Sequence, residues 1–250
     1  MKHKEILYKG IPILTALLLW QGLSALVGME MLLASPWAVT RRLAALALTP
    51  GTWGTVLFSL LRISGGFFSA LFAGFVLALI AGRFPWAKRL LQPYVATIRA
   101  VPVASFIILC LIWFSGSALT VLISFLIAFP VIYTNVLQGL ESVDPKLEEM
   151  ADLYEVGGLR RFLYIRLPGI KPFLISGCGI SVGMAWKAGV AAEVIGVVGN
   201  SIGEQLYDAK IYFLNADLLA WTVLIVLLSV AMEKLVRLAL RFVFSRLEKL

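Results

Sequence analysis

The sequence predicts an all-α integral membrane protein with about six transmembrane helices, and two observations support this fold class. First, 60% of the 250 residues are apolar and only 14% are charged, whereas roughly 25% of a soluble protein is charged. Second, the polar residues fall in short clusters between long apolar runs, so these runs must form the exterior of the protein. A spanning helix needs about 20 mostly apolar residues. Six stretches qualify: 11–28, 55–81, 91–115, 118–138, 173–192 and 217–236.

The first of these runs also has features of a secretory signal peptide, because Lys2 and Lys4 give the chain a basic start. No small-residue cleavage site follows the run, and it is long enough to span a membrane. We therefore expect it to be retained as the first transmembrane helix. Further along the chain, prolines at 93, 102 and 130 predict kinks in the third and fourth spans.

A short amphipathic helix is expected between the first two spans. Ser35 and Pro36 favour a helix start, since serine is a good N-cap and proline fits the first turn. The helix would extend to Leu48, with Arg41 and Arg42 on its polar side. It would lie along the outer membrane interface, or it would serve only as a spacer between the two spans.

The distribution of basic residues predicts the orientation, because positively charged loops stay in the cytoplasm. Of the 22 Lys and Arg residues, only Arg41, Arg42 and Lys210 fall in segments on the side opposite the two termini. Both termini are therefore expected to be cytoplasmic. The net charge of +8 then reflects topology and contact with anionic lipid. No basic patch interleaved with aromatic residues is present, so we expect no nucleic-acid partner.

Small residues in two of the spans favour close helix packing. The second span contains Gly65, Gly66 and Gly74, and the fifth contains Gly179 and Gly183 in one GxxxG pattern. This pattern fits packing within one chain as well as packing between two copies. The two cysteines lie within predicted spans, so no disulfide framework is implied.

The longest connection on the predicted cytoplasmic side, residues 139–172, is charged yet follows a helical pattern. Asp144 and Pro145 make a good helix start, because a carboxylate can cap the helix and proline fits its first turn. Apolar residues then recur at helical spacing. Gly157 and Gly158 are expected to end or sharply turn this helix.

A second helix is expected over residues 159–167, which combine apolar side chains with three arginines. Pro168 and Pro172 would end it before the fifth span. Two short amphipathic helices joined at a glycine corner would present a compact knob just under the membrane. Such a knob can dock against a separate partner, or it can rest on lipid as an interfacial hairpin.

Two groups of residues in this connection carry a resemblance to a known family. Glu149, Met150 and Ala151 are followed after thirteen residues by Ile165-Arg166-Leu167-Pro168. This pattern resembles the EAA loop of permease subunits in ATP-binding-cassette importers, and most closely the nitrate, sulfonate, taurine and bicarbonate branch. The resemblance extends from about residue 59 to the C-terminal tail.

Two positions depart from the family pattern. Met150 stands where the family has alanine, and Glu155 stands where the family has a glycine six residues after Glu149. Gly157 and Gly158 follow two residues later, and we expect them to supply the bend instead.

The resemblance implies a transport subunit of the bacterial plasma (inner) membrane that has no cofactor of its own. Two permease copies, expected to be identical, would form the pathway for a small anionic or zwitterionic solute. An extracytoplasmic binding protein would deliver the solute, and cytoplasmic ATPase subunits would dock on the loops. The 250 residues contain no GxxxxGK(S/T) phosphate loop, so ATP hydrolysis is expected on a partner chain. The residues expected to couple to the ATPase are Glu149, Met150, Ala151, Tyr154, Glu155, Gly157, Gly158, Arg160, Arg161 and Pro168.

The resemblance also suggests how the chain is organised. Residues 1–10 would form a cytoplasmic N-terminus, and residues 11–54 would hold the first span and the external interfacial helix. The permease core would follow over 55–250, with the coupling loop at 139–172 and a cytoplasmic tail at 237–250.

Ionisable residues at membrane depth are costly, so they are candidates for function. Lys187 lies deep in the fifth span and Glu193 lies near its outer end. Both are expected near the translocation pathway, where Lys187 would attract an anion. Alternatively, Lys187 pairs with a carboxylate, such as Glu193 of the same or the paired subunit. Arg62 lies shallow in the second span and can extend toward the surface.

Two other functions stay open at this point. A gradient-driven carrier or channel would show inverted repeats and several midplane charges, but only Lys187 qualifies and no repeat is visible. An intramembrane enzyme would need a catalytic group, and the only histidine, His3, lies in the N-terminal tail. This leaves no histidine-based catalysis or usual metal site within the bilayer. Ser181 and Lys187 remain as a serine–lysine pair, but their spacing does not place them on one helix face.

Overall fold

The computed structural model describes residues 2–247, and all regular secondary structure in that range is helical. The prediction of an all-α protein is confirmed. The elements are α1 (Lys2–Val27), α2 (Pro36–Leu48), α3 (Pro50–Arg83), α4 (Pro85–Ala100), α5 (Val103–Cys110), α6 (Ser117–Glu141), α7 (Pro145–Leu153), α8 (Gly158–Arg161), the π-helix η1 (Phe162–Arg166), α9 (Leu167–Ile195), α10 (Ile202–Ile211) and α11 (Asn215–Leu247).

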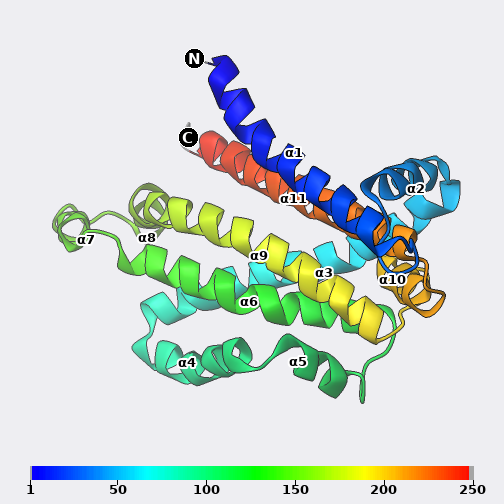
Figure 1. The fold of residues 1–250 in the computed structure, drawn as a ribbon. Helices are drawn as coiled ribbons and strands as arrows, with labels where there is room; N and C mark the ends of the chain where they lie inside the picture. The colour runs from blue at the N-terminus through cyan, green and yellow to red at the C-terminus, as the bar shows by residue number, and fades with distance from the viewer. Residues whose placement is uncertain (1, 248–250) are drawn as a thin grey trace.

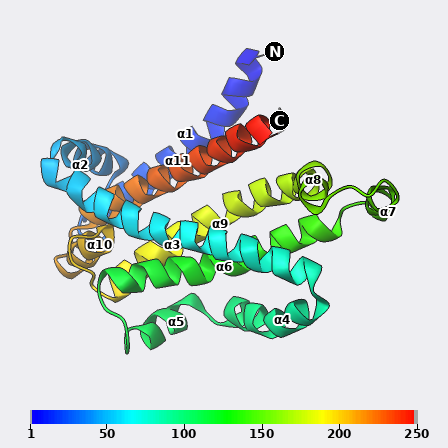
Figure 2. The same ribbon diagram turned by 180° about the vertical axis from the view of Figure 1, so that it is seen from behind.

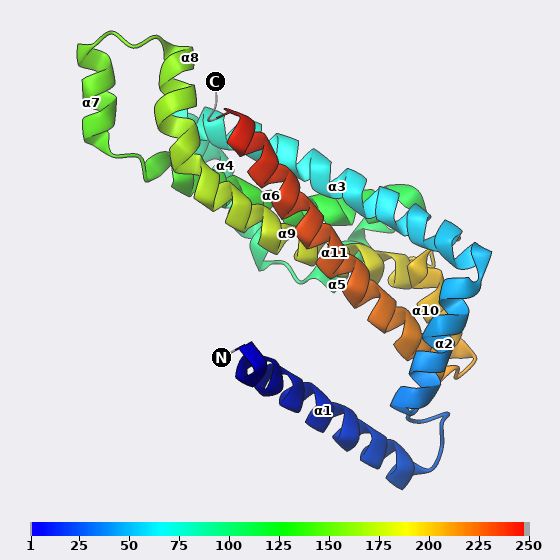
Figure 3. The same cartoon turned by 90° about the horizontal axis from the view of Figure 1, so that it is seen from above.

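Three long helices form the centre of the structure (Figure 1). α6 makes its most extensive contacts with α3 and α9. The pair α4 and α5 lies on one side of this group, and α11 lies on the other (Figure 2). α1 is set apart from the three central helices and meets α2 (Figure 3).

The two ends of the bundle carry different elements (Figure 1). We call one end the hairpin end, because α7 and α8 lie there beside the last turns of α3 and α6. α1 begins and α11 ends at this same end. We call the opposite end the α10 end, where α10 and α2 lie.

Length and hydropathy single out three helical segments that can each cross a membrane: α3, α6 and the continuous segment Gly158–Ile195. The pair α4 and α5 meets the same criteria only when the two helices are taken together. α1 contains residues 11–27 of the first predicted run, and α11 contains the sixth. Helices therefore cover most of each apolar run, and the count of six spans stays a prediction.

The kink predicted at Pro102 in the span over residues 91–115 is confirmed, and it is a full break in the helix. α4 ends at Ala100, and α5 starts again at a bend of 100°. Val101 between them has a φ of −75° and a ψ of 131°, which is extended backbone. Pro102 explains the break, because its ring disfavours helical backbone at the preceding residue and it has no N–H to donate.

Pro168 and Pro172 do not end the second helix of the loop, contrary to the prediction. The helix runs without a break from Gly158 to Ile195. The π-helix η1 ends at Arg166, two residues before Pro168, and the N–H of Leu167 donates to the carbonyl of Phe162, five residues earlier. Pro168 lies in the first turn of α9 and Pro172 lies inside it, so the helix continues through both prolines.

Glycine allows the central helices to approach closely. A Cβ on Gly66 of α3 would overlap the carbonyl oxygen of Val121 on α6. A Cβ on Gly189 of α9 would lie 2.6 Å from the Oγ of Ser124 on α6. Gly183, in contrast, has no other atom within 4 Å of its Cβ position. Glycine packing within the chain therefore centres on α6, and the face of α9 at Gly183 is open.

The predicted start of α2 is confirmed. The Oγ of Ser35 accepts a hydrogen bond of 3.2 Å from the N–H of Ala38, and Pro36 occupies the first turn. Arg42 of this helix pairs with Asp217 at the start of α11. α2 is therefore joined to the last long helix at the α10 end.

Candidate functional site

The connection between α6 and α9 forms a hairpin whose first arm is α7. Asp144 caps this helix as predicted, because its carboxylate accepts a hydrogen bond of 2.9 Å from the N–H of Lys146. Pro145 occupies the first turn, and Glu148 adds negative charge near the positive end of the helix dipole. α7 then ends at Leu153, so the first arm is a well-capped helix of two and a half turns.

The chain reverses direction after α7 at Glu155, which has left-handed backbone with a φ of 49°. Its N–H donates to the carbonyl of Asp152 at 3.1 Å, and the N–H of Val156 donates to the carbonyl of Ala151 at 2.9 Å. These two bonds form a Schellman C-cap, in which glycine usually occupies the left-handed position. Glu155 therefore performs the turn at the position where the family has glycine, with backbone strain that glycine would avoid.

The prediction that Gly157 and Gly158 supply this bend is wrong. Gly157 precedes α8 with a φ of −59°, which any residue adopts. A Cβ on either glycine would meet no other atom within 4 Å. The turn falls earlier because the last carbonyl groups of α7 find their partners at Glu155 and Val156.

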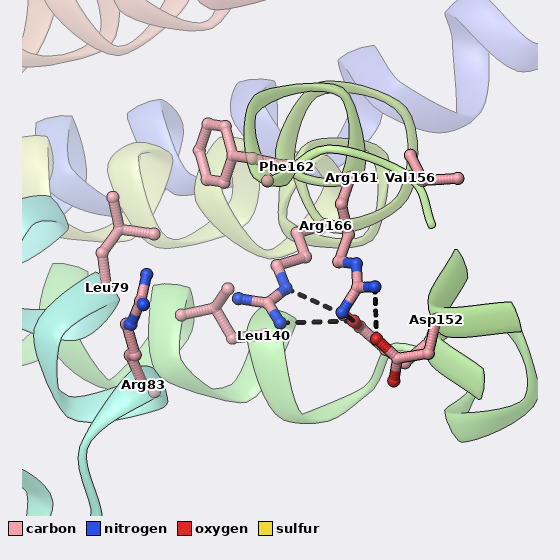
Figure 4. Close-up of a pocket in the computed structure, with 11 residues that line it drawn as sticks. Leu79, Arg83, Leu140, Asp152, Val156, Arg161, Phe162 and Arg166 are labelled. Carbon is pink, nitrogen blue, oxygen red and sulfur yellow. Dashed lines mark hydrogen bonds and ion pairs between the residues drawn. The ribbon is translucent and has the colours of Figure 1, made fainter. Parts of the chain in front are cut away.

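Four charged side chains join α7 to the second arm of the hairpin (Figure 4). Glu148 accepts hydrogen bonds from Arg166 Nε at 2.8 Å and from Arg166 Nη2 at 3.2 Å. Arg161 lies 3.5 Å from Glu148 and also pairs with Asp152. Two-point contacts between arginine and carboxylate fix orientation as well as distance, so the two arms form one unit. The spacing of Glu148 and Asp152, four residues apart on one helix face, was the only sign of this network in the sequence.

The hairpin exposes several apolar side chains among its charged ones. Leu153, Tyr154 and Leu159 are 79%, 73% and 73% exposed, and Met150 is 51% exposed. We call these four side chains the hairpin surface. They belong to a charged connection and not to a long apolar helix, so their exposure indicates a contact surface for a partner or for lipid.

The structure places the ten predicted coupling residues on the hairpin and its base, in different surroundings. Ala151 is only 2% exposed, Arg161 belongs to the ion-pair network, and Pro168 lies in the first turn of α9. The others are exposed: Glu149, Met150, Tyr154, Glu155, Gly157, Gly158 and Arg160.

At the α10 end, the side chain of Glu193 is fully buried. Its Oε2 accepts hydrogen bonds from Ser59 Oγ at 2.8 Å and from the N–H of Gly203 at 3.3 Å. Ser59 Oγ in turn accepts a hydrogen bond of 2.9 Å from the N–H of Ile202. The first N–H groups of a helix have no partner within it. Ser59 and Glu193 satisfy those of Ile202 and Gly203 at the start of α10, and so they fasten α10 to α3 and α9.

Lys187 lies on the same helix as Glu193, but its side chain is exposed. Among residues 2–247 no ion pair joins the two, since the recorded hydrogen bonds of Glu193 go to Ser59 and Gly203. Arg62, on α3, has a buried Nη1 without a hydrogen-bond partner among the described atoms. The structure therefore separates the two residues predicted for the pathway: one is enclosed and the other is accessible.

The sequence of the chain is similar to those of known transport proteins. A family model described as the binding-protein-dependent transport system inner membrane component matches residues 70–249. The chain is 31% identical to a protein named as an aliphatic sulfonates transport permease of Escherichia coli (strain K12), over 56% of this chain and 53% of that protein. It is 26% identical to the taurine transport system permease protein of the same strain, over 72% of this chain and 66% of that protein. It is 27% identical to a nitrate import permease protein of Leptolyngbya laminosa, over 74% of this chain and 67% of that protein.

The chain thus spans about half the length of the first of these relatives and about two thirds of the other two. The family match begins within α3 and continues into α11, so it includes the hairpin, Lys187 and Glu193. A match over this much of the sequence shows that the chain belongs to the family of inner membrane components of binding-protein-dependent transport systems.

Proposed function

We propose that this chain is the permease subunit of an ATP-driven importer, and that its hairpin docks on a separate cytoplasmic ATPase. The observation that carries the proposal is the hairpin surface, in which Met150, Leu153, Tyr154 and Leu159 are exposed on a unit held by ion pairs. Exposed apolar side chains on a preformed surface favour association, because little freedom is lost when a partner covers them. The family match supports a protein partner over a purely lipid contact.

In this proposal the hairpin end faces the cytoplasm. α1 begins and α11 ends at the hairpin end (Figure 1), so both termini would be cytoplasmic. The excess of Lys and Arg in the segments at this end supports the orientation, because basic loops are retained inside. The α10 end would then face outward, toward an extracytoplasmic substrate-binding protein.

Movement of the hairpin would reach the far side of the membrane through α9. The helix is continuous from Gly158 to Ile195, so an ATPase that displaces α8 would also displace α9. At its far end α9 carries Glu193, which fastens α10. ATP binding and hydrolysis on the partner would thus shift the α10 end and change access to the pathway. No ATP chemistry is assigned to this chain.

The pathway would lie between two copies of the chain. The contact of α6 with its neighbours is filled by fully buried side chains such as Ile132, Val136 and Ile170, which leaves no passage there. We therefore place the pathway at a surface, with an identical second copy on its other side. The exposed side chain of Lys187 and the open face at Gly183 support α9 as part of that surface.

The solute would be small and anionic or zwitterionic. Relatives of the chain are named for sulfonates, taurine and nitrate, and each of these carries a negative charge. Lys187 would supply a positive charge at membrane depth, where an ionisable group is rare without a function. The family match favours this reading over a gradient-driven carrier or channel.

Co-purification tests the docking step. The chain would be tagged, extracted gently from its native membrane, and analysed for the proteins that accompany it. An ATPase subunit in equal amount is expected with the unmodified chain, and none with a variant that lacks residues 150–161. Leu153→Asp is a milder variant that keeps the hairpin and should also lose the ATPase. An unmodified chain that emerges alone and stable, or variants that retain the ATPase, would contradict the proposal.

A further inference from the structure

A cleft of ≈ 880 Å³ separates the hairpin from the ends of α3 and α6. α3 contributes Leu79 and Arg83 to its walls, α6 contributes Leu140, and the hairpin contributes Phe162 and Arg166 (Figure 4). The lining therefore combines apolar side chains and arginines with the carboxylates of Glu148 and Asp152. The cleft is far larger than a single small ion needs.

The charges of the cleft do not balance within the chain. Arg161 and Arg166 are engaged by Glu148 and Asp152. Arg83, in the last turn of α3, has no carboxylate partner among the described residues. Three arginines against two carboxylates leave one positive charge in the cleft, and that charge belongs to Arg83.

The two sides of the cleft present positive groups to each other. Figure 4 shows Arg83 on the α3 wall and Arg166 on the hairpin wall, with Leu140 between them. Glu148 takes only Nε and Nη2 of Arg166, so its Nη1 is left to donate elsewhere. The unpaired guanidinium of Arg83 and the remaining Nη1 donor of Arg166 can therefore both contact an anion in the cleft. Leu79, Leu140 and Phe162 also line the cleft and can contact an apolar part of the occupant.

The cleft lies at the end of α3, a helix long and apolar enough to cross a membrane. Ile80 and Phe84, near Arg83, are 37% and 42% exposed, so apolar side chains at this end of α3 are accessible to lipid. In the orientation proposed above, this end of α3 lies at the cytoplasmic leaflet. Basic pockets between the ends of spanning helices on that side bind anionic lipid headgroups.

We propose that the cleft binds the phosphate group of an anionic phospholipid from the cytoplasmic leaflet, with Arg83 as its ion-pair partner. The proposal rests on the orientation given under the proposed function. The ion pairs of the hairpin connect only its own two arms. A bound lipid would join the hairpin to α3, and so it would hold the hairpin surface in place for docking.

Lipid retention on the intact complex tests this proposal. The chain would be purified with its accompanying proteins in detergent, supplied with phosphatidylglycerol or with zwitterionic phosphatidylcholine, and measured by native mass spectrometry and thermal unfolding. Wild type should retain and be stabilised by phosphatidylglycerol. Arg83→Gln should retain it roughly tenfold to a hundredfold less, since a charge-assisted hydrogen bond is lost. Arg89→Gln is the matched control, because Arg89 is exposed on α4 and does not line the cleft.

Four results would overturn the proposal. The first is that Arg83→Gln retains as much phosphatidylglycerol as wild type does, and the second is that wild type retains phosphatidylcholine as well as phosphatidylglycerol. The third is that inorganic phosphate without lipid stabilises the protein as much as phosphatidylglycerol does. The fourth is that Arg83→Gln loses the ATPase while its lipid retention is unchanged. The third would identify a free-anion site, and the fourth would identify a contact with the ATPase. Absence of the ATPase from the wild-type sample would contradict the proposed function instead, because lipid retention is read on the permease chain itself.

Discussion

The hydroxyl group of Ser59 donates a hydrogen bond of 2.8 Å to the carboxylate of Glu193 in the interior of the bundle. This contact connects α3 to α9 at the point where α10 begins. The N–H of Ile202, at the start of α10, donates a hydrogen bond to the same hydroxyl group. The other oxygen of Glu193, Oε1, is buried without a hydrogen-bond partner among the described atoms. The site therefore already holds one unsatisfied polar atom, and a second would destabilise it further.

Replacement of Ser59 by alanine is expected to lower the stability of the protein. The N–H of Ile202 and the carboxylate of Glu193 would each lose a buried partner, which costs about 1–3 kcal/mol. Ser69→Ala on the same helix is the matched control, because Ser69 is exposed and its hydroxyl bonds only to a carbonyl of its own helix. Thermal unfolding in detergent would measure both variants. Equal unfolding temperatures for the two would contradict the role assigned to Ser59.

Gly203 is expected to tolerate no side chain. A Cβ there would overlap the Cβ of Glu193 and crowd the backbone of α9, so Gly203→Ala should cost about 1–3 kcal/mol of stability through overpacking. Gly183→Ala is the control, because nothing lies within 4 Å of its Cβ position and alanine favours helix. The free energy of unfolding of the purified chain distinguishes them. A tolerated alanine at Gly203 would show that α10 does not pack on α9 this closely.

Replacement of Glu155 by glycine is expected to stabilise the hairpin. A residue other than glycine in left-handed backbone costs about 1–2 kcal/mol, and the flexibility of glycine in the unfolded chain offsets part of the gain. A net gain of about 1 kcal/mol should appear as slower hydrogen exchange at the N–H of Val156, which closes the C-cap. Gly157→Ala should have little effect, because Gly157 has ordinary backbone. Faster exchange in Glu155→Gly would contradict the assignment of the turn.

Glu148 is expected to matter more than Asp152 for the rigidity of the hairpin. Glu148 contacts both Arg161 and Arg166, whereas Asp152 contacts Arg161 alone and its side chain is 71% exposed. Glu148→Gln should weaken the hairpin by about 1–2 kcal/mol, and Asp152→Asn by no more than about 0.5 kcal/mol. Hydrogen exchange across α7 would measure the difference. High salt should reduce it, because partly exposed ion pairs are screened. An equal effect of the two substitutions would argue against Glu148 as the centre of the network.

Lys187 is expected to affect transport and not stability. Its side chain is exposed and has no ion pair to Glu193 within the chain, so Lys187→Met should leave the unfolding temperature unchanged. Uptake of an anionic solute by proteoliposomes that contain the complete transporter should fall by roughly tenfold, since one interaction with a charged group is lost. Lys210→Met, an exposed lysine of α10, is the control. Intact uptake with lowered stability would make Lys187 a structural residue.

The helix starts could be predicted because they depend on neighbouring residues. Ser35 and Asp144 cap their helices through N–H groups two or three residues away, so no distant contact is needed. The turn at Glu155 could not be predicted in this way. Its position depends on where α7 stops, and two backbone hydrogen bonds to Ala151 and Asp152 decide that. In the sequence, Gly157 and Gly158 were the stronger indication of a turn, yet the turn forms before them.

The continuous helix after Gly158 also could not be predicted from neighbouring residues. Pro168 is a strong breaker within an α-helix, but it lies in the first turn of α9 and the helix continues. At Pro102 the same residue type does break the helix. Pro93, Pro130 and Pro172 also lie inside helices, so a proline by itself does not decide whether a helix ends.

An all-α membrane protein with a charged hairpin between two apolar helices follows from the amino-acid sequence alone. Composition and residue spacing are sufficient for that, since a bilayer requires long apolar runs to be helical wherever they occur. The different surroundings of Lys187 and Glu193 depend instead on how the helices pack. Six residues apart, they point about 120° away from each other around α9. Which of the two is buried depends on where α3 and α10 pack, and those contacts come from residues as distant as Ser59.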